Sequence, residues 1–413
     1  MNRMDDFDYR GKTVLLRVDI NSPIDPKTKK IVNDNRIQKS LPTIKKLIDQ
    51  GAKVAMIAHQ GDTLDYQNLI PLVEHAERLS TLLGISIDYI DDVAGPAAIE
   101  KIKQLKEGQV TLLGNLRYLS EEISTFETVV KLKPEEMQET YLVRRLKPYV
   151  DMYINEAFAA AHRNAPSMVA FQETLPTAAG ELMFREISEL DKVMSNPEKP
   201  SVFCLGGAKI SDAFGMMEQV LENGTADKIL TSGITGEIFL IASGYDIGEK
   251  KRGFLKERNL LEFVEPAKKY LSLYGDKIDY PIDLAYPEDD KRLELTIDKL
   301  PAEKMFMDIG SETLKKYDAV LQQAKTIFVN GPAGVYEDVK FEKGTKELWL
   351  SIAKSQGHSV IGGGDTVSAA AQFINLDDIG YVCTAGGAMV RYLSGKKLPL
   401  IEAMEKAYNR SEG

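Results

Sequence analysis

The sequence contains few cysteines and no long apolar stretch. Its 413 residues include only 2 cysteines, Cys204 and Cys383, each inside an apolar run, which excludes a disulfide framework and a CxxC-type zinc site. No apolar stretch approaches the roughly 18 residues of a membrane span, and none follows the charged N-terminus. We therefore expect a cytoplasmic protein with two buried thiols and no membrane partner.

Two common nucleotide-binding motifs are also missing. The chain has neither a GxxxxGK[ST] P-loop nor a GxGxxG dinucleotide fingerprint.

Acidic residues outnumber basic ones, 62 to 52. The net charge of -10 discourages nucleic-acid binding over the whole surface but is compatible with a local basic cleft. Low-complexity tracts and fixed-period repeats are absent, and the 43% hydrophobic content is that of a globular protein.

Short apolar runs alternate with stretches of helical spacing along the whole chain. This alternation builds parallel sheets flanked by helices. At roughly 100 to 200 residues per domain, the length favours two or three domains. The runs form two series, so we predict an α/β protein with two doubly wound, Rossmann-like parallel-sheet domains. The predicted strands cover residues 13–19, 53–59, 86–90, 110–117 and 150–158, then 201–207, 228–233, 303–310, 325–331, 359–365 and 380–387.

Three helices are readable between these strands. Residues 35–50 place apolar side chains on one face and stop before Gly51, and residues 211–223 do the same before Gly224. Residues 177–196 also have a helical pattern and precede two prolines. We predict that this last segment is the hinge helix between the two domains.

Cationic and polar side chains follow the strands of the first series. In open parallel sheets, ligands bind beyond the carboxyl ends of the strands. Guanidinium groups match carboxylate and phosphate oxygens, and imidazole adds a further donor. The first half therefore predicts a receptor for a small, multiply charged acid, although Arg17 could be only a salt-bridged strand residue. The strand-end residues are Asp19, Asn21, His59, Arg117, His162 and Arg163, with Arg36 opening a nearby helix.

Glycines follow the strands of the second series. They let the main chain approach a polyphosphate, and the helices after Lys209, Thr366 and Gly387 would point their N-termini at it. Asp365 is placed to reach a Mg²⁺ on the nucleotide. A glycine pair alone is more commonly a tight turn, and Asp365 could be only an N-cap. The separation of arginines from glycines favours a kinase that closes over an acid and a nucleotide.

Nine motifs occur in a fixed order: RVDIN-SP, NDNRI, AHQG, NLRY, NEAFAAAHR, LGGAKISD, NGPAGVYE, GGGDT and CTAGGA. In that order the chain resembles phosphoglycerate kinase, in particular its archaeal branch. The resemblance implies reversible, Mg²⁺-dependent phosphoryl transfer between ATP and the carboxylate of 3-phosphoglycerate, giving 1,3-bisphosphoglycerate and ADP, by a monomer. It also implies that residues 1–180 bind 3-phosphoglycerate, that 181–395 bind the nucleotide, and that 396–413 return to the N-terminal domain.

The resemblance also implies roles for individual residues. Arg36 and Lys209 would be catalytic, and Asp365 would contact Mg²⁺. A carboxylate nucleophile is already deprotonated at pH 7, so no general base is expected. The implied acid site comprises Asp19, Asn21, Arg36, His59, Gln60, Gly61, Asp62, Arg117, His162 and Arg163. The implied nucleotide site comprises Gly207, Lys209, Asn330, Gly334, Glu337, Gly363, Gly364, Asp365 and Thr366.

Some positions depart from the family's usual pattern. Asp62-Thr63 stands where the family generally has a basic residue and a proline, and Ala213 replaces a second basic residue. Because a carboxylate repels a phosphate, Asp62 motivates a second hypothesis: a divergent acyl-phosphate-forming kinase for another small carboxylic acid. A third hypothesis is a non-catalytic two-domain binding protein.

Overall fold

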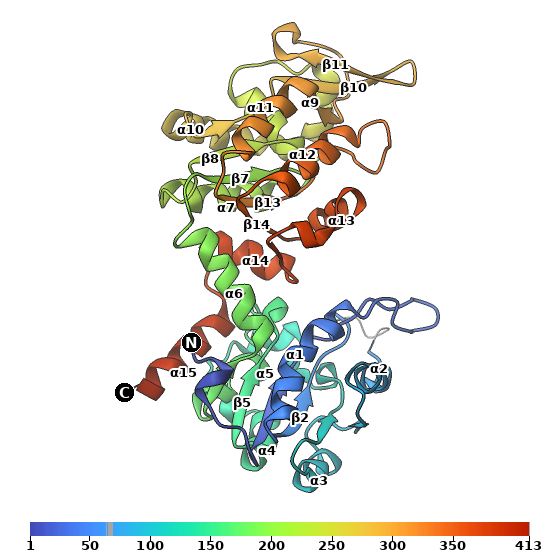
Figure 1. Ribbon diagram of the computed structural model, residues 1–413, viewed down its shortest axis with the longest axis vertical. Helices are drawn as coiled ribbons and strands as arrows, with labels where there is room; N and C mark the ends of the chain where they lie inside the picture. Colours follow the sequence, from blue (N-terminus) through green and yellow to red (C-terminus); the bar gives the residue numbers. More distant parts are fainter. Residues whose placement is uncertain (63, 65–68, 413) are drawn as a thin grey trace. The chain divides into compact units, whose positions relative to one another are not determined.

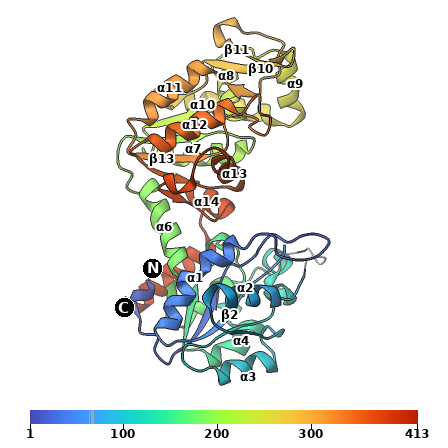
Figure 2. The same cartoon turned by 45° about the vertical axis from the view of Figure 1, so that its right-hand side comes forward.

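The computed structural model describes residues 1–62, 64 and 69–412. The chain divides into two compact units: unit 1 is Met1–Ile187 with the segment that starts at Lys397, and unit 2 is Ser188–Lys396. Helix α6 (Glu181–Met194) carries the chain from unit 1 into unit 2. Figure 1 follows the chain by colour, and Figure 2 shows the same ribbon turned by 45°.

Unit 1 is built on a six-stranded sheet whose paired strands are all parallel. The strand order is β3-β4-β2-β1-β5-β6, so β1 lies between β2 and β5. Leu16 of β1 is opposite Met56 of β2 and Ile154 of β5, and all three are fully buried, as expected for a sheet covered on both faces. The strands are β1 (Thr13–Arg17), β2 (Lys53–Ile57), β3 (Ile87–Tyr89), β4 (Val110–Leu112), β5 (Met152–Asn155) and β6 (Thr177–Ala179).

Helices flank this sheet (Figure 1, Figure 2). Helix α1 (Asn35–Asp49) buries Ile37, Ile44 and Leu47 in the same core as the strands. It ends just before Gly51, whose φ of +77° is a left-handed conformation that glycine adopts without Cβ strain. The other helices of this unit are α2 (Val73–Leu83), α3 (Pro96–Gln104), α4 (Tyr141–Leu146), α5 (Pro166–Val169) and α15 (Pro399–Glu412).

Both ends of the chain lie in unit 1, side by side (Figure 1). The Ala179 amide donates to the Asn2 carbonyl at 3.0 Å, and Asn2 Nδ2 donates to Ser411 Oγ at 3.4 Å. Helix α15 packs on α5 and β6. The C-terminal segment is therefore an integral part of the first unit.

Unit 2 repeats the architecture with a second six-stranded parallel sheet, in the order β15-β14-β13-β7-β8-β9. Cys204 on β7 is buried, as is Cys383. The predicted fold class, two parallel-sheet α/β domains, is confirmed. The strands are β7 (Ser201–Leu205), β8 (Lys228–Thr231), β9 (Ile278–Asp279), β13 (Thr326–Asn330), β14 (His358–Ile361) and β15 (Tyr381–Val382).

A small antiparallel sheet, β11-β10-β12, also belongs to unit 2. The prediction that residues 303–310 form a strand of the parallel sheet is wrong, because only β12 (Asp308–Ile309) is a strand there and it pairs antiparallel with β10 (Asp283–Glu288). The apolar run before it signalled burial rather than strand pairing: Phe306 is 1% exposed but lies outside any strand. The third strand is β11 (Lys291–Thr296).

The predicted hinge helix over residues 177–196 is too long at its N-terminal end. Residues Thr177–Ala179 form β6, and α6 starts at Glu181. Gly180 lies between the strand and the helix. A Cβ at that position would lie 1.6 Å from Glu156 Oε2, so only glycine fits there.

No helix in the described part of the chain is long and apolar enough to cross a membrane. The remaining helices of unit 2 are α7 (Ile210–Glu222), α8 (Gly233–Ala242), α9 (Glu249–Glu257), α10 (Val264–Tyr274), α11 (Ser311–Leu321), α12 (Lys343–Lys354), α13 (Gly364–Phe373) and α14 (Gly386–Leu393).

Candidate active site

A buried arginine at the end of β1 sets the protonation of His59. Arg17 is 2% exposed, and its guanidinium donates to the Val18 carbonyl at 2.6 Å and to Ser167 Oγ at 3.2 Å. Its Nη2 lies 2.9 Å from His59 Nδ1. Because a guanidinium only donates, Nδ1 accepts and the imidazole proton is on Nε2. Burial, and then the nearby arginines, hold the pKa of His59 well below its usual range, so it is a neutral N–H donor.

Arg117 and Arg163 form a cationic cluster with Arg17 beside His59. They are 8% and 9% exposed. Arg117 Nη1 donates to the Glu122 carbonyl, and Arg163 Nε donates to Glu127 Oε1 at 2.6 Å. Burial, followed by repulsion from Arg163, lowers the pKa of Arg117 to about 10. Buried guanidinium groups that destabilise one another's charge form a strong receptor for a multiply charged anion.

Glu122 supplies a buried countercharge to the arginines. Its side chain is 1% exposed; Oε1 accepts from the Ser167 amide at 2.7 Å and Oε2 accepts from Ser167 Oγ at 2.6 Å. Ser167 Oγ in turn accepts from Arg17, so a hydrogen-bonded chain joins acid and base. Burial raises the pKa of Glu122, while Ser167 and the charges of Arg17 and Arg117 oppose that rise.

A second group of predicted residues lies in the loops after β1 and β2. Arg36, at the start of α1, contacts Asp19 through Nη1 and Oδ2 at 2.7 Å, and its side chain is 38% exposed. The Gly61 amide donates to Asn21 Oδ1 at 3.0 Å, which ties the two loops together. The interactions of His59 include repulsion from Arg36. The fold thus brings the predicted Asp19, Asn21 and Arg36 to the same end of the sheet as the buried arginines.

The side chain of Gln60 bonds within the protein. Its Oε1 accepts from the Ser22 amide and from His75 Nε2, each at 2.9 Å, and its Nε2 donates to the Ser22 carbonyl at 2.9 Å. His75 is fully buried, and burial lowers its pKa to about 4. Gln60 therefore fixes the loop beside His59, whereas Asp62 is exposed.

One predicted residue and one departure from the family pattern remain in unit 1. His162 is half-buried next to Arg163. Thr63, the second residue of the Asp62-Thr63 departure, lies outside the described residues.

A pocket of about 310 Å³ in unit 2 collects the glycine-rich strand ends. The N-termini of α7, α13 and α14 all line it, so three helices present free amides and positive dipole ends to one cavity. Lys209 Nζ lies 3.1 Å from Asp365 Oδ2, and both side chains are about two-thirds exposed, at 69% and 68%. Among the predicted residues, the lining contains Gly207, Lys209, Asn330, Gly363, Gly364, Asp365 and Thr366.

Two of these glycines face open space. A Cβ added at Gly364 or Gly387 would meet no atom within 4 Å. By contrast, a Cβ at Gly331 would lie 2.3 Å from the Gly206 carbonyl oxygen, so that glycine is required for packing. Thr366 Oγ1 accepts from the Gly331 amide at 2.8 Å and holds the two strand ends together. Gly364 and Gly387 therefore leave room for phosphate oxygens to approach helix amides.

A second pocket, of about 340 Å³, adjoins the first. The two share Gly207, Ala208, Pro332 and Asp365. The predicted Gly334 and Glu337 line this second pocket, whose walls are largely apolar and include Ile234, Leu284, Phe306 and Val335. A pocket of this size suits a small-molecule ring system.

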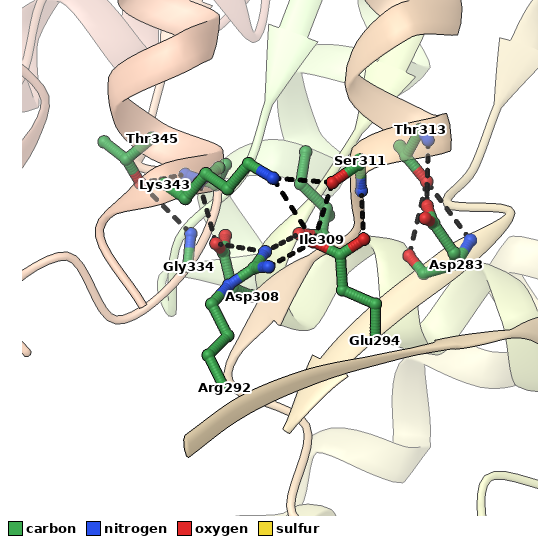
Figure 3. A network of polar contacts seen from close by, with 12 residues as sticks. Asp283, Arg292, Glu294, Asp308, Ile309, Ser311, Thr313, Gly334, Lys343 and Thr345 are labelled. Atoms are coloured by element: carbon green, nitrogen blue, oxygen red, sulfur yellow. Dashed lines mark hydrogen bonds and ion pairs between the residues drawn. The ribbon is translucent and has the colours of Figure 1, made fainter. Parts of the chain in front are cut away.

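A polar network fixes one wall of the second pocket (Figure 3). Asp308 accepts from the Gly344 amide at 2.7 Å and from Arg292 Nη2 at 3.3 Å. Arg292 also pairs with Glu294, which accepts from the Ser311 amide at 3.0 Å. Burial raises the pKa of Asp308 to about 7. These contacts tie β12 and the start of α12 to β11, the far strand of the antiparallel sheet.

The fold and the comparisons that follow define a class of protein: an α/β phosphotransferase built on two parallel-sheet units. The family model described as "Phosphoglycerate kinase" matches residues 4–396. The chain belongs to the phosphoglycerate kinase family, as the nine ordered motifs predicted.

Individual relatives support this assignment along the whole chain. The phosphoglycerate kinase of Methanothermus fervidus is 46% identical over 99% of this chain and 98% of its own length, and that of Methanococcus maripaludis is 43% identical over 98% of each. A crystal structure of phosphoglycerate kinase from Pyrococcus horikoshii OT3 superposes with a TM-score of 0.85 at 38% identity, covering 99% of this chain and 100% of that one. The predicted archaeal resemblance is confirmed, and nothing in the comparisons supports the hypothesis of another acid substrate.

Proposed function

We propose that unit 1 binds 3-phosphoglycerate, that unit 2 binds the nucleotide, and that the γ-phosphoryl of ATP passes reversibly to the acid's carboxylate. The observation that carries this division is the distribution of charge. Three arginines under 10% exposed lie in unit 1, and a glycine-lined pocket ringed by helix N-termini lies in unit 2. A small acid with a phosphate needs the former, and a polyphosphate suits the latter.

In unit 1, the inner cations bind the 3-phosphate. Arg117, Arg163 and the Nε2–H of His59 donate to its oxygens, with His162 adjacent and Gly61 and Asp62 at the rim. Arg36 lies beside the acid's carboxylate and the phosphoryl group in transfer, and Asp19 holds the Arg36 guanidinium from the other side at 2.7 Å. Asn21 contacts the hydroxyl and carboxyl end of the acid.

In unit 2, the nucleotide extends across both pockets. The triphosphate takes the glycine-lined pocket with Lys209, Asn330 and the start of α13, and the ribose and base take the adjoining one, with Glu337 accepting from ribose hydroxyls. Within the described residues no group of three or more His, Cys, Asp or Glu side chains could hold a metal ion. We propose that Mg²⁺ arrives bound to the nucleotide phosphates and that Asp365 supplies one carboxylate to it.

The chemistry needs positioning and charge neutralisation rather than acid–base catalysis. The acceptor carboxylate is ionised at neutral pH, and charge develops on the oxygens of the transferring phosphoryl. Arg36 and Lys209 are the cations assigned to that charge, together with the helix N-termini. We propose a monomer as the active form, as the family resemblance implies, and sedimentation velocity measures it.

A coupled assay tests the proposal. Purified protein receives Mg-ATP and 3-phosphoglycerate, and glyceraldehyde-3-phosphate dehydrogenase consumes the acyl phosphate while oxidising NADH. We expect NADH oxidation that depends on both substrates. Absence of turnover at millimolar concentrations of each would refute the proposed function, and faster turnover of a related small acid would favour the divergent kinase.

A further inference from the structure

A buried ion pair lies in the wall of the 340 Å³ pocket, and the proposed reaction does not use it. Glu237 on α8 and Lys251 on α9 both line this pocket and are 4% and 5% exposed. Lys251 Nζ lies 2.9 Å from Glu237 Oε1 and donates to the Phe306 carbonyl at 2.6 Å. The same ammonium lies 4.9 Å from the centre of the Phe254 ring.

Stability does not explain this pair. Removing two charges from water costs several kcal/mol per ion, and apolar residues of similar volume commonly stabilise a core at least as well. The pocket walls around the pair are apolar, with Ile234 and Leu284 among them. The two charges lie in the apolar wall of the pocket and do not stabilise the fold. They therefore indicate that the pocket recognises a polar group on a ligand.

One atom of the pair lacks a partner. Glu237 Oε2 is buried and accepts no hydrogen bond, whereas Oε1 is held by Lys251. Burial raises the pKa of Glu237, and Lys251 opposes that rise. A buried carboxylate oxygen without a donor is costly, because it has lost water and gained nothing in exchange. The group that satisfies it must be a hydrogen-bond donor on whatever fills the pocket.

The other buried carboxylate of the same pocket is less suited to this role. Asp308 Oδ2 already accepts from the Gly344 amide. Its Oδ1 would lie 2.5 Å from a Cβ on Gly334 and 1.9 Å from one on Gly344, so two glycine backbones enclose that oxygen. Figure 3 shows Asp308 held within its polar network.

We propose that Glu237 is a specificity-determining residue that accepts a hydrogen bond from the exocyclic 6-amino group of adenine. This inference rests on the proposed placement of the nucleotide base in the second pocket. Adenine presents a donor at position 6, whereas hypoxanthine and guanine present a carbonyl oxygen there, which a carboxylate repels. Lys251 fixes the carboxylate through Oε1 and leaves Oε2 for the base. The chain therefore selects ATP over 6-oxopurine nucleotides.

Steady-state kinetics with ATP and ITP test the inference, because these nucleotides differ at position 6 of the base and in the N1 proton that accompanies the carbonyl. We expect the native protein to favour ATP by about 10- to 100-fold in kcat/KM, the range of one hydrogen bond to a charged group. Glu237→Gln should bring the ratio to within about threefold of unity, because its amide can donate to the 6-oxygen. The change should appear in KM with kcat nearly constant, since the base is bound equally before and during transfer.

Two further variants separate recognition from structure. The double variant Glu237→Gln, Lys251→Met leaves no stranded ammonium, so it keeps the test valid if the single variant folds poorly, and it should also lose the preference for ATP. Asp308→Asn, a change of the enclosed carboxylate, should lower the melting temperature and keep the ATP/ITP ratio. Equal kcat/KM for ATP and ITP in the native protein would overturn the role of Glu237, as would a ratio unchanged in both Glu237 variants. Failure of both nucleotides to support turnover would instead refute the proposed function.

Discussion

Replacing Glu122 by glutamine removes the buried negative charge beside three arginines without changing the size of the side chain. Breaking a direct buried ion pair costs about 3–5 kcal/mol. Glu122 reaches Arg17 only through Ser167, and Arg163 keeps its pair with Glu127, so that range is an upper bound for this substitution. Arg17, Arg117 and Arg163 are all under 10% exposed, so water cannot replace the lost carboxylate. In a domain of roughly 150–250 residues this upper bound corresponds to a fall in melting temperature of at most about 20 °C.

The neighbouring carboxylate provides a matched control. Glu121 accepts from the backbone amides of Tyr141 and Leu142 at 3.1 and 2.6 Å, at the start of α4. Glu121→Gln changes the same chemical group one residue away and should cost about 1 kcal/mol, the value of a helix cap. Calorimetry of both variants measures the difference, with urea titration as a second measure of the free energy of unfolding.

Melting temperatures measured with added 3-phosphoglycerate provide a second test of the role of Glu122. A cluster with less countercharge attracts an anion more strongly, so the ligand should raise the melting temperature of the Glu122 variant more than that of the native protein at equal concentration. If both glutamine variants lose about the same stability, and the ligand stabilises them equally, then Glu122 is not the countercharge of the cluster.

Three other outcomes follow from the geometry. Arg36→Ala should lower kcat by about 10²- to 10³-fold with little change in KM for ATP, since its charge is assigned to the transition state; an unchanged kcat would refute that role. Gly364→Ala should leave the melting temperature nearly unaltered yet raise KM for ATP at least about tenfold, because its methyl group enters the open space that the phosphates need. His75 has a pKa of about 4 when folded and about 6.5 when unfolded, so the free energy of unfolding falls as pH drops from 6.5 toward 4, by up to about 3 kcal/mol. His75→Gln should lose that part of the pH dependence in a series of urea titrations, and an unchanged slope would contradict the assignment.

Much of the fold could be predicted because parallel strands buried on both faces are nearly continuous apolar runs. Residues 13–17 and 326–330 are examples, and each lies near the centre of its sheet. The antiparallel hairpin β10–β11 escaped prediction because β11 is rich in charged residues and only partly buried. The segment Thr177–Ala179 escaped for the opposite reason: alanines favour helices, and only pairing with β5 makes this segment a strand.

The candidate site was predictable where its residues lie within about five residues after the end of a strand, as Asp19, Arg117 and Lys209 do. Glu122 and Glu237 were missed, because a glutamate in a helical segment normally faces water and nothing local marks these two as buried. Arg17 was left undecided for a related reason. Its place inside a strand gave no indication that Ser167, 150 residues further along the chain, would connect it to a carboxylate.

In the proposed function the two units recognise anions by different physical means, and the difference constrains how each would respond to pH. In unit 1 the proposed binding groups are ionisable side chains, yet Arg117, with a pKa of about 10, stays protonated around neutrality, and His59 has a pKa held too low to gain a proton. A protonated His59 would add attraction for a phosphate, but its bond from Arg17 requires the neutral ring. In unit 2 the proposed binding groups include helix amides, which carry no titratable proton at all. Changes in phosphate ionisation near pH 6 thus act on this part of unit 1 through the ligand, because neither Arg117 nor His59 changes its charge there.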